Sequence, residues 1–340
     1  MRNQHIILFL VLFSILGQGI SQISTPLYKG EKGFQISVTY GTKNCQVYMV
    51  MQTSASGNTQ MGNTVNPEDH CGAFDVGPND QWQAENYIAN FQVSDKTFMA
   101  EYIVSQYSQT SELAMGPPSI STPKVYCVFD ELFEQKLISD KKMFVYVENN
   151  SELNSEKDLI EVGKVFFGQP DPSKPKMIPM SPYSQHAYSL GGSQKMTFQG
   201  QQLKIQSSGF IVDINTVNMV FPYVLFMRLF QILKTQGINV QSDIYHYGMW
   251  VSDIKKLKPI DFYFQQEDGS DLTFTLQPSE YLKYNEQKKA YDFLIDSDQT
   301  FKDYIIINQV ILNNHYVGFE QPTGKVYLSK KTAQENTSQQ

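Results

Sequence analysis

The sequence predicts a mostly β protein built as two lobes, and three observations support this prediction. Short strand patterns recur along the chain between clusters of Gly, Pro, Asn and Ser, whereas only two segments show helical spacing. About 320 residues remain after a leader is removed, a length that suits two cores better than one. An apolar strand that runs into a short polar turn occurs once in each half, as a gene duplication would produce.

Strands are expected wherever apolar and polar residues alternate or an apolar run stays short. They are residues 34–40, 47–51, 102–104, 143–147, 164–167, 203–205, 210–212, 261–264, 272–276 and 304–307. The two segments with helical spacing are residues 128–136 and 223–234, one in each half. Pro222 is expected in the first turn of the second helix, which ends near Gly237.

The first 21 residues have the pattern of a secretory signal peptide. Arg2 precedes an apolar run over residues 6–16, and the small residues Gly19 and Ser21 then favour cleavage after Ser21. A membrane anchor is the alternative, but the run is short for a bilayer span. We therefore expect a protein that is secreted or held in an endomembrane or lysosome-like lumen, with no membrane anchor after cleavage.

Two polar segments, 148–158 and 169–175, are the candidates for an exposed loop near the junction between the lobes. The expected organisation is a signal peptide over residues 1–21, an N-terminal β lobe over 30–150 and a C-terminal β lobe over 160–330. Residues 331–340 lack apolar patterning and are expected to form a disordered tail.

Charge and motif content argue against several classes of function. The formal net charge is −7, so nothing favours binding to nucleic acid or to an anionic membrane surface. The histidines are scattered without metal-ligand spacing, and neither a Gly-X-Ser-X-Gly elbow nor a glycine-rich phosphate loop occurs. No cofactor and no metal are expected.

Three cysteines in an oxidising compartment suggest one disulfide and one leftover thiol. Cys45 and Cys71 are the preferred pair because they lie near each other in the first half. Cys127 has apolar neighbours and is expected to be buried. Asn149 and Asn336 begin glycosylation sequons, a short pattern that is compatible with secretion.

Several segments, in their order and spacing, resemble the pepsin-like aspartic proteases over about residues 30–330. Phe210-Ile-Val-Asp213-Ile-Asn-Thr216, followed by Met219-Val-Phe-Pro222, resembles the family's second catalytic Asp-Thr-Gly-Thr turn and the proline and helix after it. Further matches are residues 111–119, 129–133, 163–168, 304–308, 315–319 and 324–326. The resemblance implies two β lobes with a central cleft that binds a peptide or protein substrate.

The family's chemistry needs two carboxylates that share one proton, one acting as general base on a water and the other as acid. Asp213 fits the second position, but Gln52 stands where the first Asp is required, and an amide cannot carry the working proton. Thr53 and Thr216 match the pattern and are expected to contribute to substrate binding. Ile214 and Asn215 replace the Thr and Gly that usually follow the second Asp.

Two further features bear on the catalytic prediction. Residues 74–83 are left for the hairpin that covers the cleft in this family, and they contain no Tyr-Gly pair. Asp75-Val-Gly77 offers a slipped alignment in which Asp75 replaces the missing acid. The residues before it do not form an apolar strand, so Asp75 is better interpreted as a turn residue.

Three hypotheses remain. The first is a secreted family member that binds peptides and is impaired in proteolysis because of Gln52. The second is a working aspartic endopeptidase. The third is a secreted β-rich structural or adhesion protein unrelated to proteases.

Overall fold

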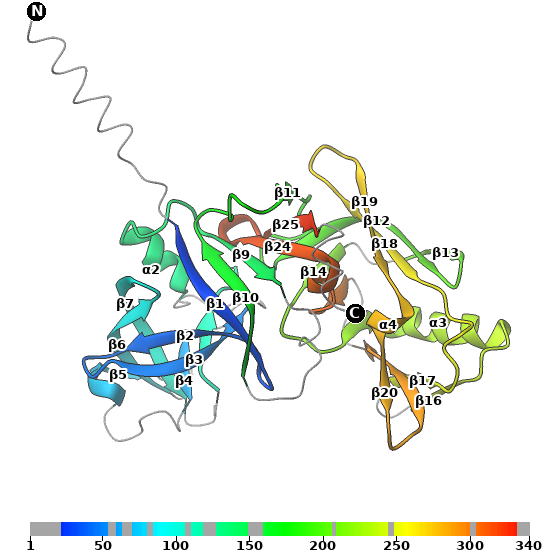
Figure 1. Cartoon of the computed structure of the whole chain (residues 1–340), viewed down its shortest axis with the longest axis horizontal. Helices are drawn as coiled ribbons and strands as arrows, with labels where there is room; N and C mark the ends of the chain where they lie inside the picture. Colours follow the sequence, from blue (N-terminus) through cyan, green and yellow to red (C-terminus); the bar gives the residue numbers. More distant parts are fainter. Residues whose placement is uncertain are drawn as a thin grey trace, which may run out of the picture.

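The computed structural model describes residues 22–53, 59–62, 70–79, 84–105, 110–117, 127–148, 159–205, 209–243, 248–299 and 304–331. Most of the described residues lie in β-strands, which confirms the predicted mostly β class. Figure 1 shows β2 to β7, which lie within residues 33–105, on the left, and β12, β13, β18 and α3, which lie within residues 189–265, on the right. Strands β9 (Lys142–Val147) and β24 (His315–Glu320) lie between the two groups. Among the described residues, every helix is too short or too polar to span a bilayer.

The strands of the first half form antiparallel hairpins around an aromatic core. Tyr40 on β2, Phe91 on β6 and Tyr102 on β7 are buried against one another, with ring centroids 5.6–6.0 Å apart. Offset and edge-to-face aromatic contacts of this kind stabilise a core beyond the area they bury. The strands are β1 (Ile23–Gly30), β2 (Gly33–Tyr40), β3 (Cys45–Gln52), β4 (Gln60–Gly62), β5 (Phe74–Asn79), β6 (Ala84–Val93), β7 (Lys96–Ser105) and β8 (Glu112–Ala114), with a 3₁₀ turn at His70–Gly72.

A shared sheet joins the two halves. Strand β10 (Ile160–Phe167) pairs with β1 and with β9 (Lys142–Val147), and β9 pairs in turn with β24 (His315–Glu320). Strand β24 continues to β25 (Lys325–Lys330), which pairs with the short β11 (Ile178–Pro179). Strand β9 falls in the predicted first lobe and β24 in the second, so backbone hydrogen bonds cross the boundary predicted near 150–160. The lobe limits themselves remain a prediction.

The second half repeats the hairpin organisation and adds a small separate sheet. Phe210, Phe262, Phe264 and Phe274 pack around one another in its core. The strands are β12 (Ser189–Phe198), β13 (Gln201–Lys204), β14 (Gly209–Val212), β15 (Met219–Pro222), β18 (Ile260–Gln265), β19 (Asp271–Leu276), β22 (Ile295–Asp298) and β23 (Tyr304–Ile307). The separate sheet has β16 (Val240–Asp243), β17 (Gly248–Val251), β21 (Ala290–Phe293) and β20 (Leu282–Asn285).

Both predicted helices are present. In α3 (Tyr223–Thr235), apolar residues at helical spacing bury Leu225, Leu229 and Leu233 on one face, and Gly237 follows with a positive φ of 70°. Pro222 precedes α3 as its N-cap rather than entering the first turn. The first helix is α2 (Val128–Glu134), and two single-turn helices, α4 (Pro278–Tyr281) and α5 (Ile311–Asn314), complete the described helices.

Lys331, the first residue of the predicted disordered tail, is ordered in the structure. The Lys331 ammonium donates a hydrogen bond to the Leu312 carbonyl at 2.7 Å and lies over the Tyr316 ring, so Lys331 is buried. A lysine can bury its stem and still satisfy its ammonium group in this way. Residues 332–340, the leader 1–21 and both sequon residues, Asn149 and Asn336, lie outside the described residues.

Candidate active site

The same strand arrangement occurs in both halves and places Gln52 and Asp213 at equivalent points. Strand β3 ends at Gln52 and pairs in parallel with β8, and β14 ends just before Asp213 and pairs in parallel with β23. The strand after each turn also matches, because β4 pairs in parallel with β7 and antiparallel with β8, as β15 does with β22 and β23. The internal duplication expected from the sequence therefore has a structural counterpart.

The two turns meet at Asp213. The Thr53 hydroxyl, which directly follows Gln52, donates to the Asp213 Oδ1 atom at 3.4 Å, across 160 residues of sequence. The same oxygen accepts the Asn215 backbone N–H at 3.0 Å, and the Asp213 N–H donates to the Ile307 carbonyl at 3.0 Å. A carboxylate oxygen with two donors is held in a fixed orientation.

Burial controls the electrostatics of Asp213. Loss of solvent raises the pKa of this carboxyl, while the Asn215 N–H and the Thr53 hydroxyl act in the opposite direction because they stabilise the ionised form. Within the described part of the chain, the hydrogen bonds to the Asp213 carboxyl come from these two groups and from no other carboxyl. None of these contacts therefore provides a second acid with which Asp213 could share a proton.

Gln52 contributes its backbone at this point. Its carbonyl accepts the Met115 N–H at 3.0 Å, which extends the β3–β8 pairing by one residue. Its side chain is half-buried and makes no hydrogen bond to another described residue. The residue that replaces the expected acid is therefore positioned by the sheet and not by a polar network.

Asn215 connects the two halves through its side chain. Its amide nitrogen donates to the Met51 carbonyl on β3, and its amide oxygen accepts the Phe34 N–H on β2 at 3.0 Å. Gly33 leaves the necessary room, because a Cβ added at that glycine would lie 2.7 Å from the Asn215 oxygen. Gly33 also has a φ of 111°, a conformation that L side chains rarely adopt.

Thr53 and Thr216, which the sequence assigns to substrate binding, both donate a hydroxyl hydrogen bond to Asp213. The Thr216 hydroxyl donates to the Asp213 carbonyl at 2.9 Å, and Thr53 is almost fully buried, with 1% of its surface exposed. Contact of either residue with a peptide remains a prediction.

A buried lysine next to these turns was not predicted. The Lys29 ammonium donates to the Gln309 side-chain oxygen at 2.7 Å and lies 4.7 Å from the centre of the Phe34 ring. The Gln309 N–H contacts the Thr216 carbonyl at 3.5 Å, so the pair adjoins the Asp213 turn. Burial lowers the pKa of Lys29 to about 8. A lysine beside a Gly-containing turn gives no sequence signal of burial.

The remaining predicted residues lie away from this site. Cys45 and Cys71 form a disulfide, with their Cα atoms 6.1 Å apart, and Cys127 has a buried free thiol. Asp75 lies in strand β5, not in a turn between elements, and its exposed carboxylate accepts the Gly77 N–H at a bulge. That bulge position explains its turn-like sequence. The strands β5 and β6 pair as a hairpin, and residues 80–83 between them lie outside the described residues.

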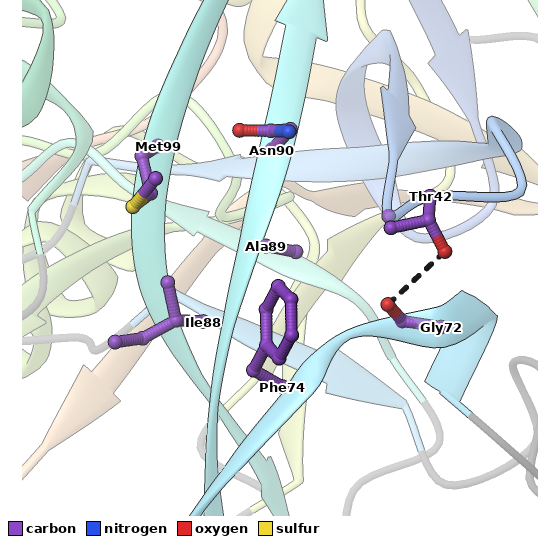
Figure 2. Close-up of a pocket in the computed structure, with 8 residues that line it drawn as sticks. Thr42, Gly72, Phe74, Ile88, Ala89, Asn90 and Met99 are labelled. Carbon is purple, nitrogen blue, oxygen red and sulfur yellow. Dashed lines mark hydrogen bonds between the residues drawn. The ribbon is translucent and has the colours of Figure 1, made fainter.

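A small pocket opens on the first half of the molecule and is separate from the Asp213 turn. Figure 2 shows Phe74, Ile88 and Met99 around it, with the Thr42 hydroxyl donating to the Gly72 carbonyl at its rim. Its lining contains none of the predicted site residues. The described residues contain no group of three or more His, Cys, Asp or Glu side chains that could hold a metal ion.

Comparison with known protein families finds a match over much of the chain. The family model described as eukaryotic aspartyl protease matches residues 81–331, which is most of the chain. The matched range includes Asp213 and Thr216 and begins after Gln52. No curated protein matches the chain significantly. A match of this extent excludes a protein unrelated to proteases and agrees with the two-lobed, mostly β fold. The chain belongs to the eukaryotic aspartyl protease family.

Proposed function

We propose that this family member is a secreted protein that binds peptides between its two lobes and has lost most or all proteolytic activity. The observation that supports this proposal is the composition of the turn pair. Asp213 is half-buried and fixed by Asn215 and Thr53, and the equivalent position on the other strand is Gln52.

The chemistry explains why this pair is a poor catalyst. Attack of water on a peptide bond needs one group that takes a proton from the water and another that donates a proton to the carbonyl oxygen or the leaving nitrogen. Asp213 can perform one of these tasks in each protonation state, but the Gln52 amide neither takes nor releases a proton near neutral pH. Loss of general acid–base catalysis typically lowers a rate by about 10²–10⁴-fold.

The peptide-binding part of the proposal rests on the family and on the remaining architecture. The paired turns, the β5–β6 hairpin and the shared sheet are present although one acid is missing. The predicted leader would direct the protein to the secretory pathway. Its final location, outside the cell or in an endomembrane or lysosome-like lumen, is part of the proposal and rests on residues 1–21 alone.

The experiment is a binding measurement with a statine-type peptide, which presents a hydroxyl group to the acidic residue. We expect saturable binding by titration calorimetry, no change in peptide mass, and weaker binding by Asp213→Ala. A matched control is Asp253→Ala, which removes an exposed carboxylate far along the chain and should bind as the wild type does. Absence of binding to the folded protein would contradict the peptide-binding proposal.

A working aspartic endopeptidase is the second candidate, favoured by the family match. It requires a carboxyl group that reaches Asp213 when substrate binds. Hydrolysis of an unfolded protein at acid pH that disappears in Asp213→Asn would establish it.

A further inference from the structure

One end of the second half carries an unusual density of positive charge. Residues 195–258 contain seven basic and three acidic residues, although the whole chain has 27 Lys and Arg against 34 Asp and Glu. All seven basic side chains are exposed. We call this set the basic surface, and it consists of Lys195, Lys204, Arg228, Lys234, Lys255, Lys256 and Lys258.

Hydrogen bonds show that the segments carrying these cations are neighbours. On the β12–β13 hairpin, Lys195 and Lys204 are directly opposite each other, and the Arg228 guanidinium of α3 donates to the Lys204 carbonyl at 3.3 Å. The Gln236 amide at the end of α3 donates to the Gln199 carbonyl in the hairpin turn at 3.3 Å. Strands β12 and β13 and helix α3 share the right-hand end of Figure 1.

The loop at 252–259 joins the same surface. The Gln199 side-chain amide lies within hydrogen-bond distance of the Lys256 carbonyl and the Lys258 N–H, at 3.3 and 3.1 Å. A Cβ placed on Gly200 would be 3.4 Å from the Lys258 ammonium nitrogen. The hairpin, the C-terminal half of α3 and this loop therefore present their cations together.

These cations differ from several other lysines in the absence of ion pairs. No carboxylate in the described part of the chain forms an ion pair with any of the seven, whereas Lys141, Lys288 and Lys325 each pair with an acid. The two nearby carboxylates are occupied otherwise. Asp253 accepts the Lys255 backbone N–H at 2.9 Å, and Asp261 accepts the Thr275 hydroxyl at 2.7 Å. Unpaired like charges repel one another, so this surface favours an anionic partner.

The neighbouring groups indicate which polyanion fits. Thr197 and Gln202 lie on the same face of the hairpin as Lys195 and Lys204. The Thr197 hydroxyl shares a hydrogen bond with the Tyr263 hydroxyl at 2.9 Å, so the exposed Gln202 amide is the group that can hydrogen-bond to hydroxyl groups of a partner. No exposed large apolar side chain occurs on the described parts of β12, β13 or the 252–259 loop, and helix α3 has one, Val224, a turn before Arg228. A single apolar side chain gives this region little to insert into a lipid layer. Six of the seven cations are lysines, which act as point charges and suit flexible sulfate groups.

We propose that the basic surface binds a linear sulfated polysaccharide. This site is separate from the Asp213 turn, and the proposal does not depend on peptide binding. The leader proposed from the sequence would bring the protein to the compartment where such polysaccharides occur. Exposed charge pairs are individually weak, so binding is expected to depend on several lysines acting together and to fall steeply with salt.

The test is binding of the full-length mature protein to immobilised heparin over a range of NaCl concentrations. We expect the triple variant Lys195→Gln, Lys204→Gln, Lys256→Gln to bind roughly tenfold more weakly near 0.15 M salt. The slope of log K against log[NaCl] should become less steep, by an amount that corresponds to about two to three lost ionic contacts. The control combines Lys32→Gln, Lys136→Gln and Lys176→Gln, three exposed lysines outside the basic surface, and should bind as the wild type does. Thermal unfolding of both variants verifies the fold.

Three outcomes would overturn the proposal. The first is equal binding of the wild type to heparin and to chemically desulfated heparin. The second is equal loss in the control variant, which would indicate net charge alone. The third is tighter binding, at the same salt, to duplex DNA, to polyglutamate or to vesicles of anionic lipid, since this would assign the surface to another class of partner.

Discussion

Replacement of Asn215 by alanine is the most informative perturbation of the turn pair. The change removes the donor to the Met51 carbonyl and the acceptor of the Phe34 N–H, both of which belong to fully buried residues of the first half. A buried polar group that loses its partner costs about 1–3 kcal/mol, so we expect Asn215→Ala to lower the free energy of unfolding by about 2–4 kcal/mol.

The assay is urea denaturation followed by tryptophan fluorescence and circular dichroism, with thermal unfolding alongside. A loss of this size lowers the melting temperature by roughly 3–6 °C for a chain of this length. Asn215→Gly restores the residue type usual in this family and should lose as much or more, because glycine also adds freedom to the unfolded chain. The control is Asn239→Ala at an exposed position, with an expected change below about 0.5 kcal/mol.

The reasoning fails if both Asn215 variants unfold within 0.5 kcal/mol of the wild type on the scale of that control. Such a result would mean that the side-chain bridge between the halves contributes little, and that the turn keeps its geometry through the sheet alone.

Three more predictions concern buried groups. Burial, with Lys330 and Lys331 nearby, lowers the pKa of His315 to about 4, so the folded protein keeps this histidine neutral and loses stability as the pH falls from 6.5 towards 4. We expect denaturant titrations to show that the free energy of unfolding falls by about 2–3 kcal/mol between pH 7 and pH 4.5. This fall should be smaller in His315→Gln and unchanged in the exposed control His186→Gln. Because burial lowers the pKa of Lys29 to about 8, the free energy of unfolding should rise between pH 8 and 10.5 in the wild type and stay flatter in Lys29→Met, and parallel curves would contradict this. The double variant Cys45→Ser, Cys71→Ser opens a loop closed over 26 residues and should lower the free energy of unfolding by about 2–4 kcal/mol. The control Cys127→Ser should keep the same number of disulfides, as measured by mass spectrometry of the oxidised protein.

The sequence predicts the strands of the structure well where local pattern decides them. Residues 34–40, 210–212 and 261–264 alternate or run apolar because one face or both faces are buried, and each lies in a strand as expected. Helix α3 follows from the spacing of its leucines. The strands of the small separate sheet were not predicted, since their short mixed segments carry no clear period.

The site was predictable in part for a different reason. Asp213 and Gln52 occupy equivalent turns because the duplicated strands leave a detectable pattern in each half. The Asn215 bridge and the Lys29–Gln309 pair depend on which distant segments meet, with 181 and 280 residues between partners. A single sequence contains no local signal for such contacts. The boundary between lobes was blurred for the same reason, because β9 pairs with β24 far along the chain.

The central claim is that Asp213 has no partner acid and therefore does not support proteolysis. The direct measurement is hydrolysis of an unfolded, fluorescently labelled protein between pH 3 and 7 by the wild type, by Asp213→Asn and by Gln52→Asp. We predict that the wild type cleaves no faster than Asp213→Asn. Any activity that appears in Gln52→Asp should require Asp213. Cleavage by the wild type that is lost in Asp213→Asn would contradict the claim and establish a working endopeptidase.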